Sequence, residues 1–213
     1  AITDALEADK VAGGGVFVHF DNISGKKAEV YVDTEVHNSG KRTRTVAVET
    51  VLVDAGDVPV KRVSQQVKLQ AGESKTVRQR FAVRNPKLWS PDSPYLYRIQ
   101  SRVKAGHEVL DGGVTRVGIR KAEFKGKDGF WLNGKPFGQL VGANRHQDFA
   151  YVGNALPNSQ QWRDAKRLRD AGCTIIRVAH YPQDPAFMDA CDEMGLFVIV
   201  ATPGWQYWNK NPE

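Results

Sequence analysis

Residues 174 to 182 have the sequence TIIRVAHYP, and this stretch decides how the second half of the chain folds. Its isoleucine and valine residues are apolar and β-branched, which is typical of a buried strand. Arg177 lies inside this apolar run, and His180 follows its end. A buried guanidinium is costly unless it is paired, so we expect Arg177 to form or support a functional site.

Two helical patterns flank this strand. The segment 157–172 carries apolar residues at helical spacing, and Asn158 or Ser159 is expected to cap its start. The segment 184–195 begins with Asp184, a good capping residue, and continues with a proline that fits the first helical position. A glycine stands at the end of each segment, as is typical of helix C-termini.

Short apolar strands are predicted at 138–144 and 196–201, and a hairpin is predicted at 130–137 with Asn133 and Gly134 at its turn. The order strand–helix–strand–helix–strand, with short links, predicts the start of a parallel α/β fold. Parallel sheets form either closed barrels or open sheets, and both classes bind ligands at the carboxyl ends of their strands. The polar and aromatic residues that follow each predicted strand therefore lie where such folds place a site.

Residues 16 to 121 have the pattern of an antiparallel sheet protein. Seven segments are rich in Val, Thr, Tyr and Phe, several of them alternate apolar with polar residues, and turn residues separate them. The pattern predicts an immunoglobulin-like antiparallel β-sandwich, without the cysteine–tryptophan–cysteine hallmark of antibody domains. The seven segments are 16–20, 28–38, 44–54, 61–69, 74–83, 95–103 and 114–124.

The composition limits the possible functions. The chain has 213 residues and a net charge of +6, and the excess of positive charge lies in residues 1–121. The longest basic cluster, GKRTR at 40–44, has the pattern of a hairpin turn, so no nucleic-acid partner is predicted. No apolar run is long enough to cross a membrane, so no membrane partner is predicted either. The two cysteines are predicted to be buried free thiols, the histidines lack zinc-ligand spacing, and no cofactor is expected.

Several motifs resemble those of a known enzyme family. They are LWSPDSPYLY (88–97), RVGIRKAEF (116–124), FWLNGKPF (130–137), GANRHQD (142–148) and IRVAHYPQDPAFMDACDEMGLFVIV (176–200). Together these motifs are similar to glycoside hydrolase family 2, which includes bacterial β-galactosidases and β-glucuronidases. The resemblance covers roughly residues 16 to 205.

The resemblance implies a mixed fold. Enzymes of this family carry a jelly-roll domain, then an immunoglobulin-like sandwich, then a (β/α)8 barrel. Residues 1–15 would be a linker from a missing upstream domain, and residues 16–121 would be the sandwich. Residues 122–213 would be the N-terminal portion of a truncated TIM-barrel catalytic domain, with its first three strands and two helices.

The resemblance also implies an activity. Enzymes of this family are retaining glycosidases with two glutamates, which follow the fourth and seventh barrel strands. This sequence contains no Asn-Glu dipeptide, the motif of the acid/base, so neither catalytic glutamate can be named. We therefore expect a fragment of a retaining exo-glycosidase for β-linked sugars, a β-galactosidase first, that is inactive by itself. The alternative is a non-catalytic carbohydrate-binding or interaction module built on the sandwich.

For the sugar-binding subsite, the resemblance implies that His146 and His180 hydrogen-bond sugar hydroxyls. It also implies that Arg177 orients the nucleophilic glutamate through a charge-assisted hydrogen bond. A lone histidine is often structural, but two histidines at strand ends of one rim favour contact with a carbohydrate.

Three more residues complete the candidate subsite implied by the resemblance. Asn144 and Asp148 would hold the loop around His146 or touch the sugar, and Trp205 would offer an aromatic face to a sugar ring. Asp148 could equally be a turn residue, and Trp205 could belong to loop packing.

The resemblance favours a periplasmic or secreted location. It leaves open whether a longer enzyme holds a structural or active-site cation.

The third barrel strand would have an open edge and apolar faces on both sides. We therefore expect the partial barrel to associate with another copy through that open edge or to be partly disordered.

Overall fold

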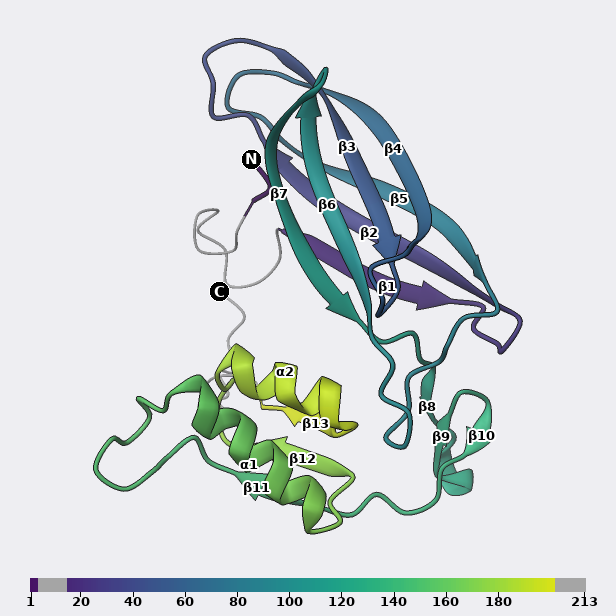
Figure 1. Ribbon diagram of the computed structural model, residues 1–213, viewed down its shortest axis with the longest axis vertical. Coiled ribbons are helices and arrows are strands. Elements are labelled where there is room, and N and C mark those ends of the chain that lie inside the picture. The colour runs from purple at the N-terminus through teal and green to yellow at the C-terminus, as the bar shows by residue number, and fades with distance from the viewer. Residues whose placement is uncertain (4–14, 202–213) are drawn as a thin grey trace, which may run out of the picture. The chain divides into compact units, whose positions relative to one another are not determined.

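The computed structural model describes residues 1–3 and 15–201 (Figure 1). The chain divides into two compact units, and each is described by itself. One unit contains residues 1–88 and 96–121, and the other contains residues 89–95 and 122–213. The short segment 89–95 thus belongs to the second unit, although it lies between two strands of the first unit in the sequence.

The first unit is a sandwich of two antiparallel sheets, and it confirms the predicted immunoglobulin-like architecture. One sheet has the strand order β1–β2–β5, and the other has the order β4–β3–β6–β7 (Figure 1). The strands are β1 (Val16–Asp21), β2 (Lys27–His37), β3 (Arg44–Val53), β4 (Pro59–Leu69), β5 (Ser74–Arg84), β6 (Tyr97–Ala105) and β7 (Glu108–Val117).

Alternating burial builds the core of this sandwich. Every second residue of β5 is buried from Val77 to Val83, which is the period of a strand with one face on the core. Two buried polar side chains join the sheets, because Thr50 Oγ1 on β3 donates to Gln79 Oε1 on β5 at 2.5 Å. Gln79 Nε2 in turn donates to the Val48 carbonyl at 2.9 Å, so the amide satisfies both of its ends inside the core.

Two predicted features of this part of the chain are wrong. Residues 40–44 form no hairpin turn, because β2 and β3 belong to different sheets and this segment connects them. The predicted strand 114–124 is two strands, since β7 ends at Val117 and β8 (Ala122–Phe124) belongs to a separate sheet in the second unit. The strand β7 ends there because its partner β6 begins at Tyr97, directly opposite Val117.

The second unit starts with a small antiparallel sheet. It has the order β10–β9–β8, with a single 3-10 turn (Gly126–Asp128) between β8 and β9. A two-residue turn joins β9 (Phe130–Leu132) to β10 (Lys135–Pro136), and both of its residues have positive φ: 53° at Asn133 and 80° at Gly134. Positive φ at both central residues is the geometry that favours Asn-Gly, so the predicted hairpin is confirmed.

A parallel α/β layer follows. The strands β11 (Gly142–Arg145), β12 (Ile175–Val178) and β13 (Phe197–Val200) pair in this order, all parallel. The helices α1 (Asn158–Asp170) and α2 (Pro185–Met194) connect them and lie on the same side of the sheet (Figure 1). The structure therefore confirms the predicted first three strands and two helices of a barrel.

The sequence predicted both ends of α2 correctly, but not the cap of α1 or the position of β11. Asp184 caps α2, because its carboxylate accepts from the Ala186 amide at 2.8 Å, and Gly195 ends α2 in the left-handed conformation. The predicted cap of α1 is wrong, since Asn158 already belongs to the helix and Pro157 precedes it without a side-chain cap. The predicted strand 138–144 is shifted toward the C-terminus, because its pairing with β12 begins only at Gly142.

The core of the α/β layer lies between the sheet and the two helices. Ile176 and Val178 of β12 pack against Ala165 of α1 and Phe187 of α2, and all four are fully buried. The backbones of β11 and β12 also approach closely, because a Cβ at Gly142 would lie 1.7 Å from the carbonyl oxygen of Ile175. Only glycine fits at that position without displacing the neighbouring strand.

An aromatic cluster closes the amino-terminal end of this sheet. Phe197, at the start of β13, meets the rings of Trp89, Phe130 and Phe137 edge-to-face at centroid distances of 5.3, 5.2 and 5.5 Å. Edge-to-face contacts of this kind add to the burial energy of aromatic residues. The small antiparallel sheet and the segment 89–95 are therefore attached to the α/β layer by its amino-terminal end.

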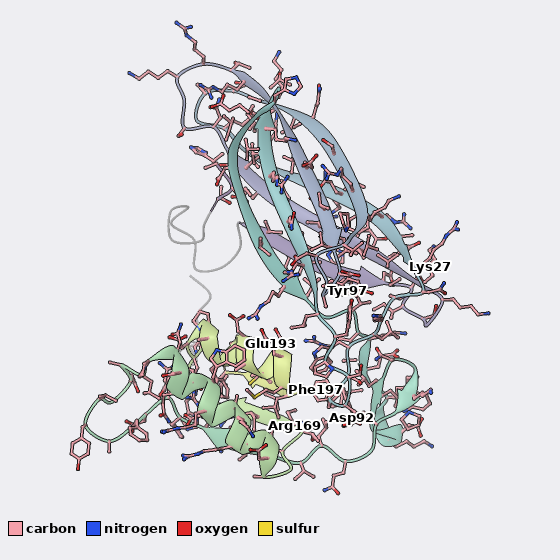
Figure 2. All side chains as sticks on the ribbon, viewed as in Figure 1. Lys27, Asp92, Tyr97, Arg169, Glu193 and Phe197 are labelled. Atoms are coloured by element: carbon pink, nitrogen blue, oxygen red, sulfur yellow. The ribbon has the colours of Figure 1, made fainter. Side chains whose placement is uncertain are left out.

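The segment 89–95 is also held by polar contacts within the second unit. The indole of the fully buried Trp89 donates to the Asp192 carbonyl of α2 at 2.8 Å. Arg169 of α1 donates to the Pro91 carbonyl at 3.0 Å and pairs with Asp92 at 3.3 Å; Figure 2 labels both charged residues.

Two glycines at helix C-termini allow a matched test of this packing. At Gly195, φ is +74° and a Cβ would lie 2.2 Å from the Pro91 carbonyl oxygen, whereas at Gly172, φ is +86° and a Cβ would meet nothing within 4 Å. We expect Gly172→Ala to cost about 1–2 kcal/mol of unfolding free energy through backbone strain alone. Gly195→Ala should cost about 1–3 kcal/mol more, because the segment 89–95 must move.

Urea unfolding followed by tryptophan fluorescence measures both costs. The first unit contains no tryptophan, whereas Trp89, Trp131 and Trp162 lie in the second unit, so the signal reports on the second unit. Equal losses of stability in the two variants would contradict the described packing of Pro91 against α2.

Candidate functional site

The candidate site lies at the carboxyl ends of β11 and β12. In the parallel register, Asn144 lies opposite Arg177, and Arg145 lies opposite Val178. Because side chains alternate along a strand, Asn144 and Arg177 share the face that points away from the helices. Arg145 and Val178 share the face that the helices cover.

The structure brings three of the predicted site residues together. His146 directly follows β11 and His180 follows β12, and their ring centroids are 5.3 Å apart in an edge-to-face arrangement. Nη2 of Arg177 lies 3.4 Å from Nδ1 of His180. A guanidinium can only donate, so this contact makes Nδ1 the acceptor and leaves the proton of a neutral imidazole on Nε2.

Arg177 differs from the sequence expectation in one respect. Its side chain is half-buried rather than buried, and its contact is an imidazole rather than an acid. Within residues 1–3 and 15–201, no carboxylate forms an ion pair with it. The guanidinium thus presents positive charge beside His180, where it suits an anion, either a carboxylate side chain or an acidic group on a ligand.

The other three predicted residues are less well placed by the structure. Asn144 is exposed, on the same face as Arg177. Asp148 is also exposed, two residues after His146 in the following loop. Trp205 lies outside the described residues. The roles of all three residues stay predictions.

The buried guanidinium of this region is Arg145, which the sequence interpretation missed. Its side chain is 5% exposed and lies between the sheet and the helices. Nη2 donates to Asp164 Oδ2 and to Gln161 Oε1, both at 2.8 Å, and Nη1 donates to Gln183 Oε1 at 2.6 Å. The guanidinium carbon also lies 4.0 Å from the centroid of the Phe187 ring.

A signal for Arg145 exists in the sequence. If Asn144 and His146 face a site, strand alternation places Arg145 on the opposite, covered face. Gln147 and Gln183 were missed as well, although both connect the two loops of the site. Gln147 Oε1 accepts from the backbone amide of Asp184 at 2.7 Å, and the backbone amide of Gln147 donates to the Tyr181 hydroxyl at 3.2 Å.

The remaining chemistry of the described residues is limited. Residues 1–3 and 15–201 contain no group of three or more His, Cys, Asp or Glu side chains that could hold a metal ion. Burial raises the pKa of the Cys191 thiol to about 12, so it stays protonated, and Cys173 is only half-buried, unlike the prediction. In the part of the chain with assigned structure, the helices are too short or too polar to span a membrane.

Fold and site together define a sandwich joined to the start of a parallel barrel, with polar groups at the carboxyl ends of its first strands. Two family models match this chain: "Glycosyl hydrolases family 2" over residues 15–120 and "Glycosyl hydrolases family 2, TIM barrel domain" over residues 123–210. The chain belongs to glycosyl hydrolase family 2.

Relatives of this family are similar over most of the chain. A β-galactosidase of Thermoanaerobacter pseudethanolicus is 36% identical over 90% of this chain and 25% of its own length. A putative β-glucuronidase of Formosa agariphila is 36% identical over 89% of this chain and 23% of its own. A crystal structure of a family 2 member from Bacteroides cellulosilyticus has a TM-score of 0.85 at 33% identity, covering 92% of this chain and 25% of that one. The chain thus spans about a quarter of the length of these relatives.

Proposed function

We propose that this chain is part of a retaining exo-glycosidase that hydrolyses β-linked sugars, and that it supplies part of the sugar-binding subsite. The grouping of His146, His180 and Arg177 at one rim of the family's barrel domain carries this proposal. A β-galactoside is the substrate we put first, because a relative with 36% identity over 193 residues bears the name β-galactosidase.

In this proposal each side chain has a distinct task. Nε2 of His180 donates to a sugar hydroxyl, since Arg177 directs the ring proton to that nitrogen. His146 contacts a neighbouring hydroxyl, and Arg177 orients the nucleophilic carboxylate through a charge-assisted hydrogen bond. Such contacts accelerate hydrolysis if they strengthen as the sugar ring distorts toward an oxocarbenium-like state.

The proposed reaction needs groups that the 213 residues do not supply. A retaining mechanism uses two carboxyl groups about 5–5.5 Å apart, one as acid/base and one as nucleophile. In this family the two glutamates follow later barrel strands, and the sequence has no Asn-Glu dipeptide. We therefore propose that the polypeptide 1–213 alone does not hydrolyse glycosides.

A second candidate function is a binding module built on the sandwich. A cavity of about 360 Å³ at one end of the first unit supports it. Apolar residues of the core and polar residues of the loop after β2 line this cavity, and they include Val36, Val46, Leu69, Val103, His37, Asn38 and Arg44. Its main polar group is already engaged, because Asn38 Nδ2 donates to the carbonyls of Arg42 and Gln70, so we rank this function second.

Hydrolysis of p-nitrophenyl β-glycosides tests the first proposal. The panel is offered to the polypeptide 1–213 and to a version extended through the remaining barrel strands. We expect only the extended protein to cleave, and we expect His180→Ala to lower its kcat/KM at least about tenfold through the lost hydrogen bond. His37→Ala, in the cavity of the sandwich, is the matched control and should leave kcat/KM unchanged. If the extended protein cleaves no glycoside, the binding module becomes the better account.

We also propose that the polypeptide 1–213, produced alone, associates with a second copy through β13. Among the described residues β13 pairs with β12 only, and Ile199 and Val200 are each 50% exposed. An open apolar edge is a template for pairing. Light scattering after size exclusion should give a dimer or larger species for the parent and a monomer for Ile199→Lys. Val114→Lys, at a 61% exposed position of the sandwich, is the control. A monomeric parent would contradict this proposal.

A further inference from the structure

The two loops of the candidate site are joined at one backbone carbonyl. The carbonyl oxygen of Arg145 accepts from the Ala179 amide at 3.0 Å and from Gln183 Nε2 at 2.6 Å. Gln183 Oε1 meanwhile accepts from Nη1 of Arg145 at 2.6 Å. Gln183 is 9% exposed, and its amide therefore binds the backbone and the side chain of the same arginine inside the protein.

This joint lies next to both histidines in the chain. Arg145 immediately precedes His146, and Ala179 immediately precedes His180. The hydrogen bond between the Ala179 amide and the Arg145 carbonyl thus fixes the two backbones from which the imidazoles project. The centroids of the two imidazole rings lie 5.3 Å apart, just beyond this connection.

Glutamine is the side chain that this position requires. It faces a guanidinium that can only donate and a carbonyl that can only accept, so it must offer one acceptor and one donor. Glutamate supplies the acceptor without the donor, and an apolar side chain of similar size supplies neither. Because the region is buried, each hydrogen bond lost on replacing Gln183 leaves a polar group of Arg145 unsatisfied or less well bonded.

A neighbouring residue provides a natural comparison. Gln161 of α1 is fully buried and also accepts from the guanidinium of Arg145, at 2.8 Å from Nη2. Gln161 accepts from the side chain of Arg145, whereas Gln183 also donates to the Arg145 backbone carbonyl next to His146. Loss of Gln161 thus perturbs the same buried charge without touching the joint between the loops.

We propose that Gln183 is a positioning residue that sets the relative placement of His146 and His180. The placement itself follows from the contacts above, and its consequence for sugar binding rests on the proposed function. Misplacement of a binding group by about 1 Å can cost a large factor in catalysis, so a residue that fixes two such groups at once matters for the site.

The test compares Gln183→Met, Gln183→Glu and Gln161→Met in the polypeptide 1–213. Imidazole proton and nitrogen resonances of His146 and His180 are recorded by NMR without any ligand, together with the nuclear Overhauser effect between the two rings. We expect both Gln183 variants to move the resonances of both histidines and to weaken the inter-ring effect at least about twofold. Gln161→Met should lower the stability of the second unit but leave these signals in place.

Each outcome decides the proposal. Unchanged histidine signals in a folded Gln183 variant, or equal changes in Gln161→Met, would overturn it. Gln183→Glu keeps the acceptor for Arg145 and covers the case in which Gln183→Met does not fold. If neither Gln183 variant folds while Gln161→Met does, Gln183 serves folding and the positioning role is wrong.

A second experiment, a ligand titration, tests the proposed sugar binding separately from the positioning role of Gln183. Phenyl β-thiogalactoside and phenyl β-thioglucuronide are titrated into the parent and the variants, with the histidine resonances as the readout. We expect one of the two to bind the parent and to bind the Gln183 variants at least about tenfold more weakly. If neither sugar shifts the parent's signals, the sugar-binding function fails for this chain, whereas the comparison of ring positions without ligand still judges Gln183.

Discussion

The second unit depends on the ion pair and hydrogen bonds that the buried guanidinium of Arg145 forms. A buried charge is stable only when it is paired and hydrogen-bonded, and its partners here come from two separate segments. Gln161 and Asp164 lie on α1, and Gln183 lies in the loop before α2. Since these segments must converge on the end of β11, the loops after β11 and β12 are drawn together. Strand alternation then places Asn144 and His146 on the other face, where a site can form.

The two ends of the parallel sheet have different tasks. At the amino-terminal end, Phe197 packs into an aromatic cluster with Trp89, Phe130 and Phe137, and hydrogen bonds from Trp89 and Arg169 hold the segment 89–95 in place. At the carboxyl end, Arg177 and two histidines meet around a hydrogen-bonded joint. Barrels of this type separate stability and chemistry in the same way. The apolar end holds the layer in place, so the polar end can carry exposed and half-buried functional groups.

Local features of this fold could be predicted from the sequence, because they depend on neighbouring residues. The Asn133–Gly134 turn, the cap at Asp184 and the left-handed end at Gly195 each follow from the conformational preference of one or two residues. The end of β7 at Val117 could not be predicted, since it depends on where the distant partner β6 begins.

The candidate site shows the same division. Two histidines and Arg177 were expected at one rim because parallel strands end on one side of a sheet, and the structure brings these three residues together. Arg145 was missed because its partners lie 16 to 38 residues away, and no local pattern connects them. The packing of α1 and the path of the loop before α2 bring Gln161 and Gln183 to its guanidinium. The roles of the predicted residues toward a sugar remain proposals.

Amide hydrogen exchange of Ala179 tests the central claim most directly. If the Arg145 carbonyl joins the two loops, the Ala179 amide is hydrogen-bonded and buried, and it should exchange as slowly as the bonded amides inside β12. Exchange of Ala179 at the rate of an unprotected peptide, with β12 still protected, would show that the loops open independently. The joint at Arg145 would then not hold the site.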